Sequence, residues 1–313
     1  MRIVFMGTPE FAVPSLKVLV ENDMNVVAVV TATDKYGGRG GKKLIQSEVK
    51  KYAESVGLPI LQPKNLKSES FVEELRSFQA DLQIVVAFRM LPEIVWKLPK
   101  LGTFNLHASL LPDYRGAAPI NWAIINGEST TGVTTFFIDE KIDTGELILQ
   151  KEVSISPDET AGELHDRLME VGGELVLKTT ELIANSKVTA QAQPQTKNLK
   201  TAHKLNKANC KIDWSQPKEV IYNKIRGLNP YPSAWCYLVN GEETLNIKVY
   251  LVSLEEKEHV LENGQLLISK SELKVATKNG LINLIEIQLP GKRKMLIKDI
   301  LNGYDFKLNS KML

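Results

Sequence analysis

The first half of the chain alternates short apolar runs with amphipathic stretches. Residues 2–6 are apolar apart from Arg2 and lead into Gly7, and residues 11–22 then repeat apolar side chains at helical spacing. Two further apolar runs, 25–31 and 80–88, predict buried strands. Strands that alternate with helices predict a parallel sheet with right-handed crossovers. Uninterrupted apolar strands indicate that both faces of the sheet are covered.

The same pattern continues to about residue 186. Three more runs predict strands: 102–107, 132–138 and 147–153. A helix is predicted from 160 to 185, because Thr160 and Glu163 form a capping-box pattern ahead of an amphipathic stretch. The sequence therefore predicts an α/β domain with a mostly parallel sheet over residues 1–186.

The pattern changes beyond this point. Residues 187–211 are rich in Gln, Asn, Thr and Lys, with six lysines and no acid, which predicts an extended basic linker over 187–208. A helix is predicted at 217–228, and short alternating strands follow it: 234–239, 245–253, 264–268, 273–277 and 280–288. Turns rich in Asn and Gly separate several of these strands. We therefore expect residues 209–313 to form a small antiparallel barrel.

The composition is that of an ordinary globular protein, with 43% hydrophobic and 24% charged residues. The first apolar run is too short for a signal peptide, and no run approaches the ~18 apolar residues of a membrane span. We expect a cytoplasmic protein with no membrane span. The two cysteines, Cys210 and Cys236, are too few for a disulfide framework and indicate reduced thiols.

The net charge of +2 is unevenly divided. Residues 206–313 hold 16 Lys/Arg and 12 Asp/Glu, a charge of +4, which leaves −2 for residues 1–205. This asymmetry favours an acidic partner for the C-terminal part. A positively charged barrel is a common nucleic-acid platform and equally a common inert domain, so both interpretations stay open here.

A glycine-rich basic segment lies at Lys35–Lys43, KYGGRGGKK, with four glycines and four basic residues in nine positions. This composition predicts neither helix nor strand. It fits a mobile arm that contacts the phosphates of a large anionic partner, and it fits a solvated surface loop equally well.

The densest group of chemically capable residues is Asn105–Pro119, NLHASLLPDYRGAAP. Asn105 and His107 alternate along a strand, so their side chains face the same side. They lie at the carboxyl end of a predicted parallel strand, where open α/β sheets place their sites. An amide can donate to a carbonyl oxygen, and an imidazolium can stabilise an oxyanion and release a proton.

Asp143 follows a predicted buried strand and precedes Thr144-Gly145, a turn signal. A carboxylate near an imidazole would favour the charged ring and fix its tautomer, but spacing alone leaves open whether Asp143 reaches His107. An ordinary structural turn is the alternative.

The remaining histidines share no ligand spacing, so we expect no metal site.

At four places these residues resemble the methionyl-tRNA formyltransferase family. The segments are FMGTPEFAVPSL at residues 5–16, NLHASLLPDYRGAAPINW at 105–122 and IDTGE at 142–146, and residues 211–235 match the start of the family's C-terminal domain. The resemblance covers nearly the whole chain. It implies a Rossmann-like catalytic domain and an OB-like barrel that binds the tRNA backbone.

The resemblance further implies transfer of a formyl group from 10-formyltetrahydrofolate to the methionine of initiator methionyl-tRNA. Asn105, His107 and Asp143 are the implied catalytic residues. The folate site would be lined by Ser109, Leu110, Leu111 and Pro112, and the acceptor stem would be contacted by Arg39, Lys42 and Lys43. A monomer is expected.

Two departures from the family pattern and two alternatives accompany this interpretation. The glycine loop is one residue longer than usual, and the segment at Arg89-Met90 is one residue shorter and lacks the usual glycine. One alternative is a formyltransferase or hydrolase of the same fold that acts on a sugar nucleotide or on water. The other is a catalytically silent RNA-binding protein that keeps the fold.

Overall fold

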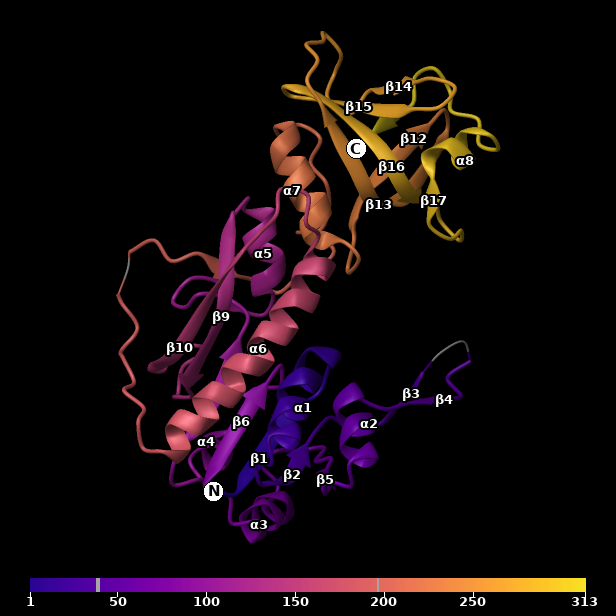
Figure 1. Ribbon diagram of the computed structural model, residues 1–313. Coiled ribbons are helices and arrows are strands. Elements are labelled where there is room, and N and C mark those ends of the chain that lie inside the picture. The colour runs from indigo at the N-terminus through magenta and orange to yellow at the C-terminus, as the bar shows by residue number, and fades with distance from the viewer. Residues whose placement is uncertain (38–39, 196) are drawn as a thin grey trace. The chain divides into compact units, whose positions relative to one another are not determined.

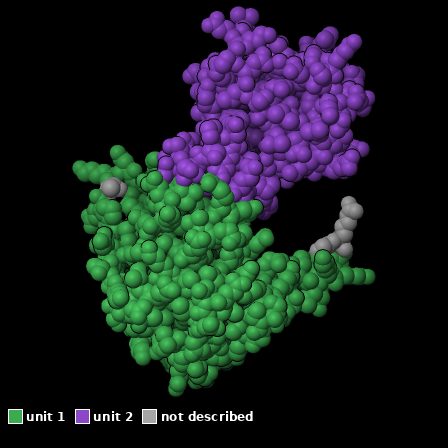
Figure 2. Space-filling view, viewed as in Figure 1, with its two compact units in different colours: residues 1–116, 131–153, 165–201 green, residues 117–130, 154–164, 202–313 purple. Residues whose placement is uncertain are grey.

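The computed structural model describes residues 1–37, 40–195 and 197–313. The chain forms two compact units, each assembled from separate stretches of sequence (Figure 2). Unit 1 comprises residues 1–116, 131–153 and 165–201, and unit 2 comprises residues 117–130, 154–164 and 202–313.

Unit 1 is built on a seven-stranded sheet with the strand order β10-β9-β7-β6-β1-β2-β5. The strands are β1 (Ile3–Gly7), β2 (Val26–Val30), β5 (Ile60–Leu61), β6 (Leu82–Val86), β7 (Thr103–His107), β9 (Thr130–Phe137) and β10 (Leu147–Ser154). The strands from β5 to β7 pair in parallel, and β9 runs antiparallel to β7. Every residue of β1 and β6 is buried. The prediction of a mostly parallel sheet covered on both faces is therefore confirmed.

Helices lie between these strands or after the last of them, and two match the helices predicted over residues 11–22 and 160–185. They are η1 (Glu10–Ala12), α1 (Val13–Glu21), α2 (Glu48–Ser55), α3 (Glu69–Ser77), α4 (Glu93–Trp96) and α6 (Ala161–Ala184). The predicted capping box of α6 is confirmed, because the Glu163 carboxylate accepts from Thr160 N and Glu163 N donates to Thr160 Oγ1.

The long helix α6 runs along the sheet of unit 1 (Figure 1). Two neighbouring glycines in α6 allow close contacts with the sheet and with α1. A Cβ on Gly172 would be 2.7 Å from the Leu106 side chain in β7, and one on Gly173 would be 3.2 Å from the Pro14 backbone. Leu106 alternates with Asn105 and His107 along β7, so α6 packs on the opposite face of the strand from those two side chains.

The glycine-rich segment departs from the prediction. It contains strand residues at both ends, because β3 (Lys35–Gly37) pairs antiparallel with β4 (Lys43–Ile45). Gly40 and Gly41 have φ values of 86° and 65°, a backbone region open to glycine, and this lets the chain reverse between the strands. The expectation that this segment excludes strands was wrong, since backbone pairing needs no favourable side chains.

Unit 2 contains a nearly closed antiparallel barrel of the OB-like kind expected for the C-terminal domain. Its strands are β12 (Ala234–Asn240), β13 (Glu243–Glu255), β14 (Leu266–Ile268), β15 (Leu273–Thr277), β16 (Gly280–Gln288), β17 (Met295–Leu296) and β18 (Lys311–Met312). The order is β14-β15-β16-β13-β12-β18, with β17 on β16, and a bridge between Gln265 and Lys311 joins the two ends. The helices are α5 (Pro119–Ile125), α7 (Lys218–Leu228) and α8 (Ile297–Leu301).

Two short strands, β8 (Arg115–Gly116) and β11 (Thr201–Ala202), complete the secondary structure. Within residues 1–37, 40–195 and 197–313, no helix has the length and apolar character needed to cross a membrane.

Candidate active site

Strand β7 carries the two polar residues that the sequence singles out. Asn105 pairs with Val85 of β6 and with Phe136 of β9, so its position is fixed from both sides. Asn105 is half-buried and His107 is buried. Both point to the same face at the carboxyl end of a parallel strand, as the sequence predicts.

The two ring nitrogens of His107 have different surroundings. Nε2 lies 2.9 Å from the carbonyl oxygen of Tyr114. A carbonyl oxygen only accepts hydrogen bonds, so Nε2 carries the proton and donates it. Nδ1 faces Asp143 Oδ2 at 3.9 Å. This fixes the tautomer of the neutral ring and turns its basic nitrogen toward the carboxylate.

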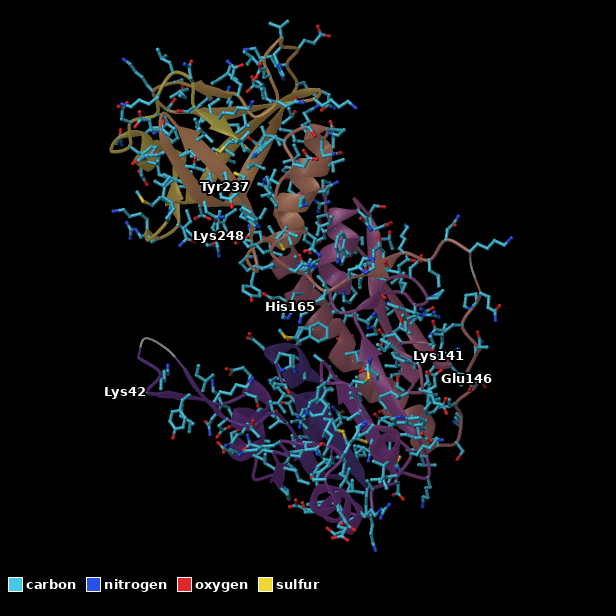
Figure 3. All side chains as sticks on the ribbon, turned by 180° about the vertical axis from the view of Figure 1, so that it is seen from behind. Lys42, Lys141, Glu146, His165, Tyr237 and Lys248 are labelled. Carbon is cyan, nitrogen blue, oxygen red and sulfur yellow. The ribbon has the colours of Figure 1, made fainter. Side chains whose placement is uncertain are left out.

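Asp143 is positioned by the backbone around it. Its φ is 55°, an uncommon value for a residue with a side chain, and Oδ2 accepts a hydrogen bond of 3.0 Å from Gly116 N. Upstream, Asp139 Oδ1 accepts from Lys141 N and from Thr144 Oγ1, which closes the start of the turn. We call residues 139–146 the Asp143 turn. Figure 3 labels Lys141 and Glu146, which flank Asp143 in it.

The end of the Asp143 turn requires a glycine. Phe137 N donates to Glu146 O at 2.9 Å, so the chain folds back tightly on β9. A Cβ on Gly145 would lie 1.6 Å from the Phe137 carbonyl oxygen. No side chain fits there, so glycine determines where Asp143 is placed.

The Asn105 amide has no hydrogen-bond partner among the described residues, although it is half-buried. A buried amide is usually paired within the protein, so an unpaired one beside a histidine is available to a ligand. With the amide as donor and His107 facing a carboxylate, the site can polarise a carbonyl group, stabilise an oxyanion and move a proton.

The segment predicted to line a folate site is largely tied to the protein itself. Ser109 is fully buried, and its Oγ donates to the Asp113 carbonyl at 2.7 Å. Leu111 is also buried, and its N donates to Thr134 Oγ1. Leu110 and Pro112 are half-buried. The folate role of the segment stays a prediction, and these two side chains are the ones left for it.

One residue of the predicted linker, Gln193, belongs to this site. Gln193 lies between Arg115 and the Asp143 turn and makes hydrogen bonds to both. Composition concealed it, because a Gln-rich polar stretch is typical of a solvated connection. The sequence carries no local signal for it, because Gln191, Gln193 and Gln195 look alike within this run.

A cavity of about 640 Å³ opens beside these residues in unit 1. Trp96, Arg115, Asp139, Thr144 and Gln193 are among the residues that line it. Its size is typical of a small-molecule site. The Asp143 turn therefore forms part of the cavity lining, whereas Asn105, His107 and Asp143 themselves are not among the lining residues.

Of the residues predicted to contact RNA, Lys42 and Lys43 lie on the hairpin β3–β4. Arg39 falls outside the described residues. Lys42 and Lys43 are exposed, and Figure 3 shows Lys42 on the hairpin that projects from unit 1. The base of the hairpin is anchored at Asp34. Hydrogen bonds from Lys50 and then Gln62 hold the pKa of the Asp34 carboxyl below its usual range.

Unit 2 presents a second basic group. The Lys207 and Lys211 ammonium groups lie 5.3 and 5.9 Å from the Trp235 ring, and Lys211 also lies 5.2 Å from the Tyr237 ring. On the described part of the chain, no cluster of three His, Cys, Asp or Glu residues has the geometry of a metal site.

Sequence comparisons extend over the whole chain. The formyl transferase family profile matches residues 1–180, and the profile for the formyl transferase C-terminal domain matches residues 204–305. The methionyl-tRNA formyltransferase of Flavobacterium johnsoniae is 56% identical over 312 residues, covering 100% of this chain and 99% of the relative. That of Parabacteroides distasonis is 51% identical, covering 97% and 96%.

Comparison with solved structures concerns the fold alone. The N-formyltransferase from Helicobacter canadensis, solved with folinic acid and dTDP-3-aminofucose, has a TM-score of 0.64 at 20% identity and covers 94% of this chain and 99% of its own. HypX from Aquifex aeolicus, solved with tetrahydrofolic acid, has a TM-score of 0.65 at 18% identity, covering 96% of this chain and 47% of its own.

Proposed function

This chain belongs to the methionyl-tRNA formyltransferase family, and from that premise we propose how its own residues carry the reaction. It transfers the formyl group of 10-formyltetrahydrofolate to the α-amino group of initiator methionyl-tRNA. The observation that carries our assignment is the group formed by the unpaired Asn105 amide, the oriented His107 ring and the Asp143 carboxylate.

The Asn105 amide donates to the formyl oxygen and stabilises the negative charge that develops when the amine attacks the carbon. In its protonated form the His107 ring adds to this stabilisation, and the Asp143 carboxylate faces its Nδ1 at 3.9 Å. One carbon–nitrogen bond forms to the methionine and one breaks to the folate. The proton lost by the amine returns to the leaving nitrogen through His107 and Asp143.

The cavity beside the Asp143 turn is proposed as the folate site. It shares Thr144 with the turn, and its lining includes the cations of Arg115 and Lys141, which suit the carboxylates of a folate tail. Leu110 and Pro112 of the Ser109–Pro112 segment are the side chains proposed to contact the same donor.

Asn105→Ala is expected to lower kcat by about 10²–10³-fold with little change in KM, because the lost hydrogen bond is strongest in the transition state. Single-turnover formylation with purified methionyl-tRNA measures this. Asn126→Ala, at the C-terminal end of α5 in unit 2, is the matched control and should retain full turnover. A variant at Asn105 that raised KM alone would contradict the oxyanion role.

Lys42 and Lys43, with Arg39, are proposed to contact the phosphates of the tRNA acceptor stem. The double substitution Lys42→Ala/Lys43→Ala should weaken tRNA binding. It should also make the negative slope of log K against log salt less steep by about 1–2, since each phosphate contact releases counterions. Filter binding over a salt series measures the slope. Lys17→Ala/Lys51→Ala, two exposed lysines on α1 and α2, should leave it unchanged. An affinity that did not vary with salt would remove the proposed role of the hairpin.

The direct test of the function is incubation with 10-formyltetrahydrofolate and charged initiator tRNA, followed by chromatography of the released amino acid. Formylmethionine is the expected product. The parallel reaction uses an amino-sugar nucleotide as acceptor, and formylation of the sugar without formylation of the tRNA would favour the same-fold alternative.

Three further features remain proposals. We propose a monomer that acts in the cytoplasm, with a catalytic domain at 1–186, a linker at 187–208 and a tRNA-binding domain at 209–313. Light scattering of the purified chain gives the mass in solution, and a mass of two chains would contradict the monomer.

A further inference from the structure

We propose that Gln193 is a positioning residue that holds Arg115 and the Asp143 turn in one fixed arrangement. The inference rests on the proposed role of Asp143 in formyl transfer. Gln193 also lines the cavity proposed for the folate, and its effect on the Asp143 carboxylate passes through the backbone of the Asp143 turn.

The hydrogen bonds of Gln193 use the full capacity of its amide. Oε1 accepts from Arg115 Nε at 3.2 Å and from Arg115 Nη2 at 2.5 Å. Nε2 donates to the carbonyl oxygens of Asp143 at 3.0 Å and Gly145 at 2.8 Å. A carboxamide has two acceptor positions and two donors, and all four are occupied. A fully satisfied, half-buried amide makes its surroundings rigid.

These bonds close a ring of contacts around the Asp143 side chain. Gln193 holds the Asp143 backbone from one side, and on the other side it holds Arg115. Gly116, the next residue, donates its N–H to Asp143 Oδ2 at 3.0 Å. The position of the Asp143 carboxylate opposite His107 therefore depends on both the amide oxygen and the amide nitrogen of Gln193.

Two features explain why an external tether is needed here. Asp143 has a φ of 55°, which side-chain-bearing residues rarely adopt, so the turn does not hold this shape by local preference alone. The Gln193 segment is itself anchored to unit 1, because Gln191 and Leu147 exchange two backbone hydrogen bonds of 2.7 and 2.9 Å. The backbone that carries Gln193 is therefore held in place by these two bonds.

Two substitutions distinguish the contacts with Arg115 from those with the Asp143 turn. Gln193→Leu removes both sets of contacts at nearly constant volume. Gln193→Glu keeps an acceptor for Arg115 but replaces the two donors with an oxygen that faces the Asp143 and Gly145 carbonyls. Gln191→Ala is the control, since its side chain is exposed and its backbone bonds persist.

Formylation kinetics test the proposal. Gln193→Leu and Gln193→Glu should each lower kcat by about 10–100-fold, because a small misplacement of a reacting group has an effect of that size. KM for methionyl-tRNA and the melting temperature should stay near those of the parent chain. Gln191→Ala should match the parent chain in all three. A Gln193→Leu protein with parental kcat would overturn the proposal.

A double-mutant cycle with Asp143→Asn identifies the route of the effect. If Gln193 acts through Asp143, Gln193→Leu should cause little further loss, under about 2-fold, in the Asp143→Asn background under single-turnover conditions. An equal loss in both backgrounds would show an independent structural effect and overturn the proposal. Full activity of Asp143→Asn alone would instead overturn the role of Asp143, and the tether with it.

Discussion

His107→Ala is expected to lower the rate of formyl transfer by about 10³–10⁴-fold while leaving tRNA affinity nearly intact. The substitution removes the ring that stabilises the oxyanion and passes the proton, and contributions of this kind have such magnitudes. In transition-state free energy the loss is about 4–5 kcal/mol. Affinity is spared because the residues proposed to bind tRNA lie on the hairpin β3–β4 and in unit 2.

Single-turnover formylation gives the rate, and filter binding gives the affinity. Because His107 is buried, His107→Asn is the second variant, since its amide can still donate toward the Tyr114 carbonyl and fills part of the space. His259→Ala is the matched control, a histidine of unit 2 that hydrogen-bonds the Gly280 carbonyl at 3.0 Å. Unchanged turnover in both His107 variants would refute the mechanism.

Gly145→Ala is expected to lower both turnover and stability. The added Cβ would lie 1.6 Å from the Phe137 carbonyl oxygen and 2.8 Å from its carbon, so the Asp143 turn has to move away from β9. Asp143 and the Gly145 carbonyl held by Gln193 would move with it. We expect kcat to fall by about 10²-fold or more and the chain to lose about 1–3 kcal/mol of stability.

Thermal unfolding and formylation together measure both parts of this prediction. Gly303→Ala is the control, because no atom lies within 4 Å of the added Cβ and Gly303 has no positive φ. A Gly145→Ala protein with parental turnover would show that the position of Asp143 is not set by this close approach. A loss of stability without loss of turnover would point to the same conclusion.

The elements of the fold could be predicted from the sequence to a large extent. The apolar runs at 2–6 and 80–88 gave strands β1 and β6, and the Thr160–Glu163 pattern marked the start of α6. These signals are local, since apolar periodicity and caps act within one element. The hairpin at Lys35–Ile45 was missed because its strands are held by backbone pairing, which leaves no hydrophobic pattern.

The site was predicted in part. Asn105 and His107 were placed on one face because alternation along a strand is a local property. Whether Asp143 reaches His107 depended on how residues 139–146 fold back over β9, and the Gly145 contact with Phe137 decided it. Gln193 was taken for part of a linker, because its partners lie about 50 and 78 residues away in the chain.

The sequence by itself determined the alternation of strands and helices, the Asn-x-His pair at a strand end and the formyltransferase motifs. Only the tertiary structure decided which distant segments meet. It brought the Tyr114 carbonyl to Nε2 of His107 and the Asp143 carboxylate to the other side of the ring, and it joined Arg115 to the Asp143 turn through Gln193. The physical reason is that element formation depends on local periodicity, whereas hydrogen bonds between loops depend on the packing that brings their ends together.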